Sequence, residues 1–491
     1  MSVTVEVRLL SGKTASVNAG LDEQVELLKR RAQIALQVGK GRLVDSFGAV
    51  LDARVSIEDS CVKDGDSLTF HISKAQVFAT RRGFIALLGD GSVVAWGRVA
   101  WDSVVQEKLQ NVQHIQSCGN ELAPGFCGSA FAAILGDGSV VTWGPAAYGG
   151  DSRGVQEQLK NVQQIQSSPG YREGAFAAIL GDGSVVTWGS ARGGGDSSAV
   201  QHQLKNVQQI QASSGSFAAI LCDGSVVTWG DADCGGDSSA VQEQLKNVQQ
   251  IQAARDSFVT FRGAFAAILG DGSVVTWGDA DHGGDSISVQ AQLKNVQHVQ
   301  ANHRSFAALL GDGSVVTWGA ALKGGDSRAV QEQLKNVQQI QASRFAVAAI
   351  LGNGSVVTWG AADCGGDSSA VQDQLKNVQQ IQATAFAFAA ILGDGSVVCW
   401  GGLSHGRIVV RYVTVKDQLK NVQQIKASEG TLQPKNYNGD YRIWGGGRWI
   451  VLCMADVKAT VAKVAAQLRL QMMKATQDYN KATMSGWCAY L

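Results

Sequence analysis

The sequence is poor in the residues and runs that mark several classes of protein. Of its 491 residues only 4 are Pro and 9 are Cys, and no C-x-x-C pair occurs. This argues against flexible Pro-rich linkers, a disulfide framework and a paired-cysteine zinc module. No apolar stretch approaches the ~20 residues of a membrane-spanning helix. The formal net charge is zero, so nothing draws the whole chain to nucleic acid or anionic membrane.

Patterns that carry chemistry are also scarce. The 7 His are dispersed, and none pairs with another at the i, i+4 spacing of a zinc-binding helix. No G-x-x-x-x-G-K-[ST] phosphate loop occurs, and the recurring Gly-Asp-Gly-Ser lies between two expected strands rather than before a helix. The opening MSVTVEVRLL lacks the cationic start and apolar run of a signal peptide. We therefore expect a non-enzymatic protein of the cytoplasm or nucleus, with no catalytic residue, metal or cofactor.

What the chain has in abundance is an internal repeat. The block FAAILGDGSVVTWG recurs with small changes, and the spacings of its Trp are 47, 45, 41, 48, 41, 41 and 41 residues. A period in this range indicates a solenoid or a propeller. The eight tryptophans are Trp96, Trp143, Trp188, Trp229, Trp277, Trp318, Trp359 and Trp400.

One unit, taken as residues 212–252, predicts a small set of strands. Residues 216–221 form a short buried strand, Asp223-Gly224 is a hairpin turn, and residues 226–229 are β-branched and aromatic. Residues 247–252 alternate apolar and polar as a half-buried strand does. The segment from Ser239 to Leu245 is open between a capped helical turn and a fourth strand.

A unit of this size has too little apolar surface to fold alone, so the units must stack. The core D-G-S-V-V-T-W-G, repeated eight times, and the NVQQIQA stretches between its copies resemble the repeat of the regulator of chromosome condensation family, which forms β-propellers. Two family elements differ: Ser216 stands where a His is usual, and Gly235-Gly-Asp-Ser238 replaces a Gly-Gln-Leu-Gly turn. The resemblance implies a closed β-propeller of about eight short blades, with seven possible, over residues 74–430.

The first 73 residues lack the repeat and predict two strands, a helix over residues 22–37, and further short strands. This order and the stretches Leu10-Ser-Gly-Lys-Thr14 and Gly41-Arg-Leu-Val44 resemble ubiquitin's β-grasp. The resemblance implies a ubiquitin-like domain at residues 1–73, whose receptor patch corresponds to Leu10, Val44 and His71. A polar His at the third position departs from an apolar patch. The alternative is a small domain that only caps or solubilises the repeats.

Beyond residue 430 the repeat decays into an extension, residues 431–491. Residues 455–481 have the spacing of an amphipathic helix, with an apolar stripe and separate basic residues. We expect this helix to dock on the repeats or to bind a partner or membrane surface. The stripe consists of Val457, Val461, Val464, Leu468 and Met472.

The repeat length varies at one place, between the Asn-Val-Gln strand and the following Phe strand. Extra residues fall within 117–129, 167–174 and 253–263. Equivalent loops of a propeller emerge on one face, and insertions there often mark a binding surface. An aromatic residue occurs in all three insertions and Arg in two of them, and both types are favoured at interface hot spots. The candidate protein-binding residues are Phe126, Tyr171, Arg172, Arg255, Phe258, Phe261 and Arg262.

Two other sets of charged residues could form sites or could simply face solvent. Asp231, Asp233 and Asp237, with equivalents at 279, 281 and 285, could suit calcium, but most units lack the first two and no Glu closes the loop. Turn and capping roles are therefore expected. A ring of Lys follows from the Leu-Lys-Asn step and could attract an acidic partner. The regular Asp residues instead favour a balanced surface.

These features favour a non-catalytic protein-interaction scaffold or adaptor, and the ubiquitin-like resemblance implies a link to the ubiquitin pathway. The alternatives are a non-catalytic part of a ubiquitin ligase system, since ligases of the HECT class carry similar propellers, and a guanine nucleotide exchange factor for a small GTPase, as the founding member of the repeat family is. Protein partners are expected, and neither nucleic acid nor a membrane span.

Overall fold

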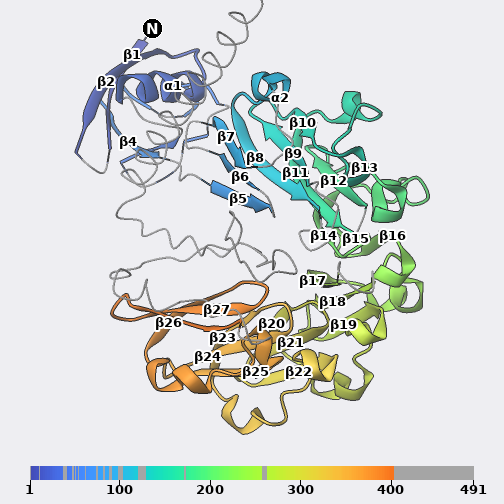
Figure 1. Ribbon diagram of the computed structural model, residues 1–491. Helices are drawn as coiled ribbons and strands as arrows, with labels where there is room; N and C mark the ends of the chain where they lie inside the picture. The colour runs from blue at the N-terminus through green and yellow to red at the C-terminus, as the bar shows by residue number, and fades with distance from the viewer. Residues whose placement is uncertain are drawn as a thin grey trace, which may run out of the picture. The chain divides into compact units, whose positions relative to one another are not determined.

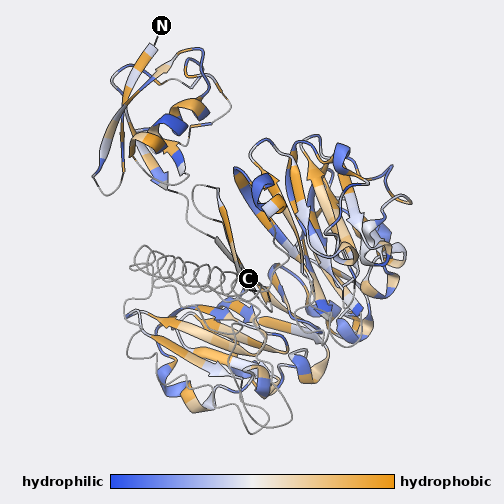
Figure 2. Cartoon of the chain, turned by 45° about the horizontal axis from the view of Figure 1, so that its top comes forward, coloured by the Kyte–Doolittle hydropathy of each residue, from blue (hydrophilic) through white to orange (hydrophobic). Residues whose placement is uncertain are grey.

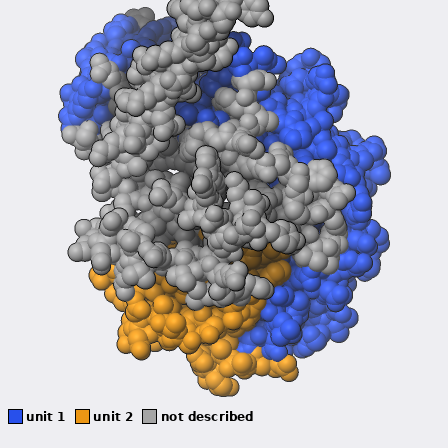
Figure 3. All heavy atoms as spheres, viewed as in Figure 1, with its two compact units in different colours: residues 1–327, 428–448 blue, residues 328–427, 449–491 orange. Residues whose placement is uncertain are grey.

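The computed structural model describes residues 2–402, apart from residues 10–11, 37–40, 47–48, 50, 53–54, 61, 73–75, 81–82, 88–90, 98–102, 120–128, 171–172 and 257–261. The chain divides into two compact units, coloured separately in Figure 3. Within the described residues, unit 1 holds everything up to residue 327 and unit 2 begins at residue 328. The predicted extension 431–491 and its helix lie outside the described residues. No helix in the described part is long and apolar enough to cross a bilayer.

The N-terminal part is a four-stranded sheet with one helix. Its strands are β1 (Ser2–Arg8), β2 (Thr14–Gly20), β3 (Gly41–Val44) and β4 (Ser67–Ile72), and its helix is α1 (Val25–Leu36). The strand order is β2-β1-β4-β3, with β1 and β4 parallel and the outer pairs antiparallel. The strands bury one alternate set of residues against the buried stripe of α1. This is the ββαββ order that the sequence predicts; its relationship to ubiquitin stays a prediction.

The rest of the described chain forms eight three-stranded antiparallel sheets, here numbered 1 to 8 in chain order (Figure 1). In every sheet the second strand lies in the middle. The first strands are β5 (Gln76–Thr80), β8 (Val112–Cys118), β11 (Val162–Pro169), β14 (Val207–Ala212), β17 (Val248–Asp256), β20 (Val296–Ala301), β23 (Val337–Ala342) and β26 (Val378–Ala383).

The middle and third strands come from the recurring block itself. The middle strands are β6 (Gly83–Leu87), β9 (Ala130–Leu135), β12 (Gly174–Leu180), β15 (Ser216–Leu221), β18 (Arg262–Leu269), β21 (Ser305–Leu310), β24 (Ala346–Leu351) and β27 (Ala387–Leu392). The third strands are β7 (Val93–Gly97), β10 (Val140–Trp143), β13 (Val185–Gly189), β16 (Val226–Gly230), β19 (Val274–Gly278), β22 (Val315–Gly319), β25 (Val356–Gly360) and β28 (Val397–Gly401). The mainly β, propeller-type architecture with repeated short sheets is confirmed.

The sheet boundary differs from the unit taken from the sequence. The Asn-Val-Gln strand pairs with the Phe strand that follows it, so β14 opens the sheet of β15 and β16 rather than closing the preceding one. Residues 212–252 therefore span parts of two sheets. The repeat period is the same for either frame, which is why the sequence alone does not choose between them.

The middle strands are buried on both faces. Phe217, Ala218 and Ala219 of β15 are all 0% exposed, because one face meets the preceding sheet and the other the following sheet. The small Ala side chains let neighbouring sheets approach closely. Burial on both faces explains why the middle strand is a continuous apolar run and does not alternate apolar and polar residues. Figure 2 shows the hydrophobic colours concentrated on these strands.

The segment from Ser239 to Leu245, for which the sequence allows either a helical turn or a fourth strand, is helical in most of the repeats. Ser239–Gln244 is a 3-10 helix, η5, in the crossover from sheet 4 to sheet 5. The equivalent crossovers contain α2 (Ser103–Lys108), η2 (Gln156–Gln158), η7 (Ile287–Gln292), η9 (Gln331–Gln333) and η11 (Ser369–Gln374). A second set of short helices follows the third strand: η1 (Ala146–Tyr148), η3 (Ala191–Gly195), η4 (Ala232–Cys234), η6 (Ala280–His282), η8 (Ala321–Lys323) and η10 (Ala362–Cys364).

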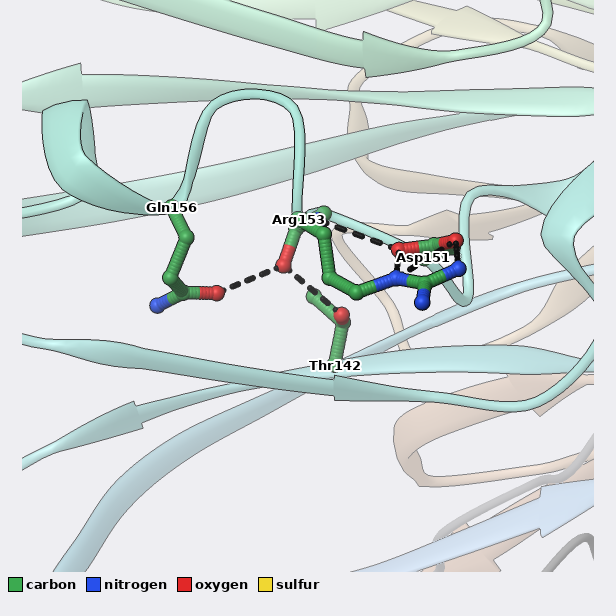
Figure 4. A network of polar contacts seen from close by, with 5 residues as sticks. Thr142, Asp151, Arg153 and Gln156 are labelled. Atoms are coloured by element: carbon green, nitrogen blue, oxygen red, sulfur yellow. Dashed lines mark hydrogen bonds and ion pairs between the residues drawn. The ribbon is translucent and has the colours of Figure 1, made fainter.

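A polar relay ties the crossovers that follow sheets 2 to 5 and sheet 7 to their own sheets, and Figure 4 shows it in sheet 2. The hydroxyls of Thr142 and Ser152 lie 2.9 Å apart, and Ser152 donates to Gln156 Oε1 at 2.9 Å. Gln156 Nε2 then donates to the Val140 carbonyl at 2.9 Å, so the outer strand gains a side-chain partner. The sequence signal was assigned to a capping box starting at Ser239; the hydroxyl that bonds the Gln there is that of Ser238.

Neighbouring sheets within a unit are joined by Trp. The Phe217 and Trp229 rings stack at 5.2 Å between centroids, and the indole N–H of Trp229 donates to the Gly194 carbonyl in the preceding repeat at 3.0 Å. The same bond joins Trp188 to Gly149 and Trp277 to Gly235, each at 3.0 Å. Within a compact unit, neighbouring repeats thus stack through Trp as the sequence predicts. Closure of the sheets into a ring stays a prediction.

Candidate functional site

The hairpins between first and middle strands of sheets 2 to 5 meet at one end of the stack in unit 1. Ser167 Oγ of sheet 3 donates to the Ser117 carbonyl of sheet 2 at 2.8 Å. A Cβ on Gly170 would lie 3.2 Å from the Ser214 carbonyl, and a Cβ on Gly263 would lie 3.0 Å from Ser213 Cβ. The bases of the three insertions therefore lie along one surface, here called the hairpin end.

The insertions lengthen these hairpins by further strand pairing. In sheet 5, Arg255 pairs with Gly263 and Asp256 with Arg262, two rungs beyond the Ala254–Ala264 pair. In sheet 3 the added rung is Pro169 with Gly174. Strands β17 and β18 reach 9 and 8 residues, against 6 for each of β14 and β15. The insertions of sheets 3 and 5 thus stand on extended two-stranded stems.

The short helices after the third strands complete the hairpin end. Ser213 Oγ and Ser216 Oγ both donate to the Cys234 carbonyl at 2.7 Å, which fastens η4 to the hairpin of its own sheet. Asn302 Nδ2 bonds the Lys323 carbonyl at 2.6 Å in the same way. A side-chain hydroxyl or amide therefore holds η4 and η8 against the hairpins of their own sheets.

Arg262 anchors the stem of sheet 5 through a cluster of charges. Its guanidinium donates to Asp279 Oδ2 at 2.5 Å and lies 3.9 Å from Asp233 of the neighbouring loop. Asp279 Oδ1 lies 2.5 Å from Nδ1 of His282, which is 1% exposed. Burial alone would raise the pKa of Asp279, but the hydrogen bonds from Arg262 and His282 outweigh it and lower that pKa. The carboxylate stays ionised and holds the stem.

The acidic loops act as turns and ion-pair partners. Asp231 Oδ1 accepts the Asp233 N–H at 3.0 Å, and its carboxylate lies 3.5 Å from Arg192 Nε. Asp237 Oδ1 accepts the Ser239 N–H at 2.9 Å. In the described residues no three His, Cys, Asp or Glu side chains are placed to hold a metal ion. Asp231 and Asp237 thus take the turn roles expected of them.

The sequence-derived binding residues are only partly within the described chain. Arg255 and Arg262 both lie exposed on the stem of sheet 5. The other five lie outside the described residues: Phe126, Tyr171, Arg172, Phe258 and Phe261. Whether these residues bind a partner stays a prediction.

The receptor patch implied by the ubiquitin resemblance, Leu10, Val44 and His71, is not an exposed apolar patch in the described residues. Val44 is only 6% exposed, His71 is half-buried, and Leu10 lies outside the described residues. Arg42 pairs with His71 across β3 and β4, whereas Val44 pairs with Thr69. At this place the described sheet presents polar rather than apolar side chains.

The lysines of the Leu-Lys-Asn step lie at the other end of the sheets, beside the Asp-Gly turns. Val248 N donates to the Gly224 carbonyl at 2.8 Å, which sets this step against the turn of the preceding sheet. Lys160 and Lys246 pair with Glu157 and Glu243 at 3.1 and 2.9 Å. Exposed pairs of this kind contribute little stability, but they balance the charge.

Sequence reasoning missed one Arg in unit 2. The guanidinium of Arg344 lies 4.8 Å from the Phe345 ring centroid and 5.9 Å from that of Phe386, and the residue is 6% exposed. The Arg344 N–H also donates to the Ala385 carbonyl at 3.0 Å, which links the hairpins of sheets 7 and 8. The signal available was the replacement of Ser214-Gly215 by Arg-Phe at equivalent hairpin positions.

A shallow depression on the outside of sheets 2 and 3 carries no catalytic arrangement. Ala146, Gly154 and Gly189 line it together with the pair Asp151 and Arg153. The Arg153 side chain is 90% exposed and its guanidinium bonds Asp151, which lowers the pKa of that carboxyl to about 2 (Figure 4). An acid held ionised by an exposed partner is suited to a surface role rather than to proton transfer.

Comparison with known proteins gives similarity in structure only. No family model matches the chain, and no curated protein matches it. Prp20p from Saccharomyces cerevisiae is 16% identical, over 50% of this chain and 72% of that one, with a TM-score of 0.31. The CRINKLY WD40 ectodomain of the Arabidopsis thaliana receptor kinase ACR4 is 16% identical, over 60% and 98%, with a TM-score of 0.31.

A designed protein based on ubiquitin is 22% identical, over 14% of this chain and 87% of its own length, with a TM-score of 0.14. Similarities of this size transfer neither activity nor partners. The propeller-type assignment rests on the eight repeated sheets and their Trp-mediated junctions.

Proposed function

We propose that this protein is a non-catalytic interaction scaffold that binds a protein partner at the hairpin end. The observation that carries this is the gathering of three lengthened hairpins on one surface, through contacts between their bases. Insertions confined to one face of a repeat protein mark binding surfaces, and the described part of the stem presents two exposed Arg. The stem is anchored by the ion pair between the exposed Arg262 and the buried Asp279.

The test replaces the long hairpin of sheet 5 with a short one that the chain already uses. Residues 254–264 are exchanged for Ser-Ser-Gly-Ser, the hairpin of sheet 4, which shortens the repeat to 41 residues. A second variant, Phe258→Ala with Phe261→Ala, keeps Arg262 and its ion pairs. Proteins captured from cells by the full chain are quantified by mass spectrometry for each variant.

We expect both variants to lose the same captured proteins, with Lys205→Ala at the other end of the sheets as the matched control. Equal capture by both variants and the wild-type chain would show that this hairpin is not the binding surface. Acceleration of nucleotide release from a panel of small GTPases would instead favour an exchange activity.

We further propose that residues 1–73 connect the scaffold to ubiquitin-pathway proteins in the cytoplasm or nucleus. The support is the ββαββ order with its parallel β1–β4 pair. Because Val44 is buried, the test uses the full chain with Leu10→Ala and His71→Ala together. Loss of ubiquitin-pathway proteins from the captured set, with retention of those bound at the hairpin end, is the expected result. An unchanged set would count against this patch.

A further inference from the structure

One of the equivalent hairpin turns differs from the others at a chemically reactive position. Between the middle and third strands, seven of the eight turns read Asp-Gly, and the turn of sheet 7 alone reads Asn353-Gly354. Asn is a thermolabile residue, because its side-chain amide can be attacked by the main-chain nitrogen of the next residue. Glycine at that next position leaves the nitrogen unhindered, since it has no Cβ. Asn353 is exposed, so water reaches it.

The side chain of Asn353 makes the contacts that Asp makes in equivalent turns. Its Oδ1 accepts the Ser355 main-chain N–H at 2.9 Å and the Ser355 hydroxyl at 2.7 Å. In sheet 3, Asp182 Oδ1 accepts the same two bonds from Ser184 at the same two distances. Both bonds end on a single oxygen, so either an amide nitrogen or a second oxygen can occupy the other position. The repeats therefore show this turn with Asn and with Asp.

Main-chain hydrogen bonds fix the turn that contains Asn353. The Gly354 N–H donates to the Leu351 carbonyl at 2.8 Å, and Gly354 has a positive φ of 77°. The Gly354 carbonyl accepts the N–H of Val378, in the first strand of sheet 8, at 2.9 Å. Sheets 7 and 8 belong to the same compact unit. The nitrogen that would attack the Asn353 side chain is thus held as a hydrogen-bond donor, within a turn that joins two sheets.

We propose that Asn353 is a site of spontaneous deamidation, and that opening of this hairpin sets its rate. In the reaction, the Gly354 nitrogen loses its proton and attacks Cγ of Asn353, the Cγ–Nδ2 bond breaks, and ammonia leaves. Water then opens the resulting cyclic imide. The net change is one water consumed and one ammonia released, and no oxidant, reductant or enzyme takes part.

The two products of the ring opening have different consequences. Attack of water at Cγ restores the main-chain amide and leaves Asp, which equivalent turns already contain. Attack at the main-chain carbonyl carbon of residue 353 leaves isoaspartate, in which the chain runs through the side chain and gains one carbon. The extra carbon displaces Gly354 from its bonds with Leu351 and Val378. The Asp product is therefore silent, and the isoaspartate product loosens the junction between sheets 7 and 8.

The deamidation rate of the full chain, folded and unfolded, tests whether hairpin opening controls the reaction. While the Gly354 N–H is bonded its nitrogen cannot attack, so the folded rate equals the unfolded rate multiplied by the fraction of open hairpins. Trypsin releases residues 345–376, which contain one Asn, so mass spectrometry follows this site separately from Asn438-Gly439. At mildly alkaline pH we expect deamidation to be roughly tenfold or more slower in the folded chain than in urea. Equal rates would overturn the proposal.

Two variants test the equivalence of the turns. Asn353→Asp reproduces the silent product, and its midpoint of urea unfolding should equal that of the wild-type chain. Asp312→Asn places Asn-Gly in the equivalent turn of sheet 6, where Asp312 accepts bonds from Ser314 at 2.9 and 2.6 Å. Folding should slow deamidation at position 312 by a factor similar to that at position 353. A lowered midpoint for Asn353→Asp, or equal rates at position 312 in the folded and unfolded chains, would contradict the proposal.

The isoaspartate product has a signature of its own. A methyltransferase specific for isoaspartate should label the aged wild-type chain in residues 345–376, whereas an aged Asn353→Gln chain, which must close a larger ring, should stay unlabelled there. In the isoaspartate fraction, the amides of Gly354 and Val378 should exchange with solvent roughly tenfold faster than in the Asp fraction. Equal exchange in the two fractions would refute the consequence assigned to the junction between sheets 7 and 8.

Discussion

The Asn of the Leu-Lys-Asn step gives a sharp test of how the sheets are connected. Seven of these residues have positive φ of 54–56°, in the left-handed region that most side chains avoid. Asn247 holds the chain so that its carbonyl accepts the Gly270 N–H at 2.8 Å while Val248 N reaches the Gly224 carbonyl at 2.8 Å. The conformation of this one residue thus positions two backbone hydrogen bonds, one within its own sheet and one to the preceding sheet. Its side chain is exposed and bonds only Gln249 nearby.

Asn247→Ala should therefore destabilise the protein by about 1–2 kcal/mol, the usual difference between Asn or Gly and other residues in this conformation. Asn247→Gly should cost less than about 1 kcal/mol, because Gly adopts the positive φ freely and loses only extra freedom of the unfolded chain. Urea unfolding followed by tryptophan fluorescence and by far-ultraviolet circular dichroism measures both. If the Gly variant is as damaged as the Ala variant, the side-chain contacts rather than the backbone conformation are responsible.

Three further outcomes are expected. Trp229→Phe should lower the free energy of unfolding by about 1–3 kcal/mol, since the buried Gly194 carbonyl loses its donor; an unchanged urea midpoint would contradict the junction described. The pKa of Asp279 is lowered in the folded state, so its carboxylate stabilises the fold at neutral pH, and this contribution is lost as the pH falls below about 4. Asp279→Asn should weaken that acid dependence in urea titrations at several pH values. Iodoacetamide at pH 8 should label exposed Cys222 rapidly and leave Cys118 unmodified in the native protein, because burial raises the pKa of that thiol to about 12; mass spectrometry of peptides reports both.

Much of the repeat could be predicted because its signals are local. The Asp223-Gly224 turn, the two flanking strands and the stacked Trp229 follow from residue types and period. The sheet boundary at Val207 could not, because a periodic sequence looks the same in every frame. The crossover from Ser239 also stayed open, since its helical turn is settled by a side-chain relay to a distant strand.

The hairpin end could likewise be predicted only in part. That the insertions share one end follows from repeat equivalence, and the contacts of Ser167 and Gly263 agree with it. The anchoring of Arg262 by Asp279 and His282 joins residues up to 20 positions apart and has no local signature. Burial of Val44 likewise depends on packing that a matched motif does not convey.

The uniform junction between neighbouring sheets also bears on how such a chain can grow or shrink during evolution. The indoles of Trp188, Trp229, Trp277, Trp318 and Trp400 each meet a backbone glycine carbonyl rather than a partner side chain, so one of these copies fits the glycine of another without a compensating change. Unequal recombination that adds or removes one 41-residue segment would leave every remaining contact with a matching surface. Duplication of one segment of the gene would then change the number of sheets, and the protein would still fold at each step.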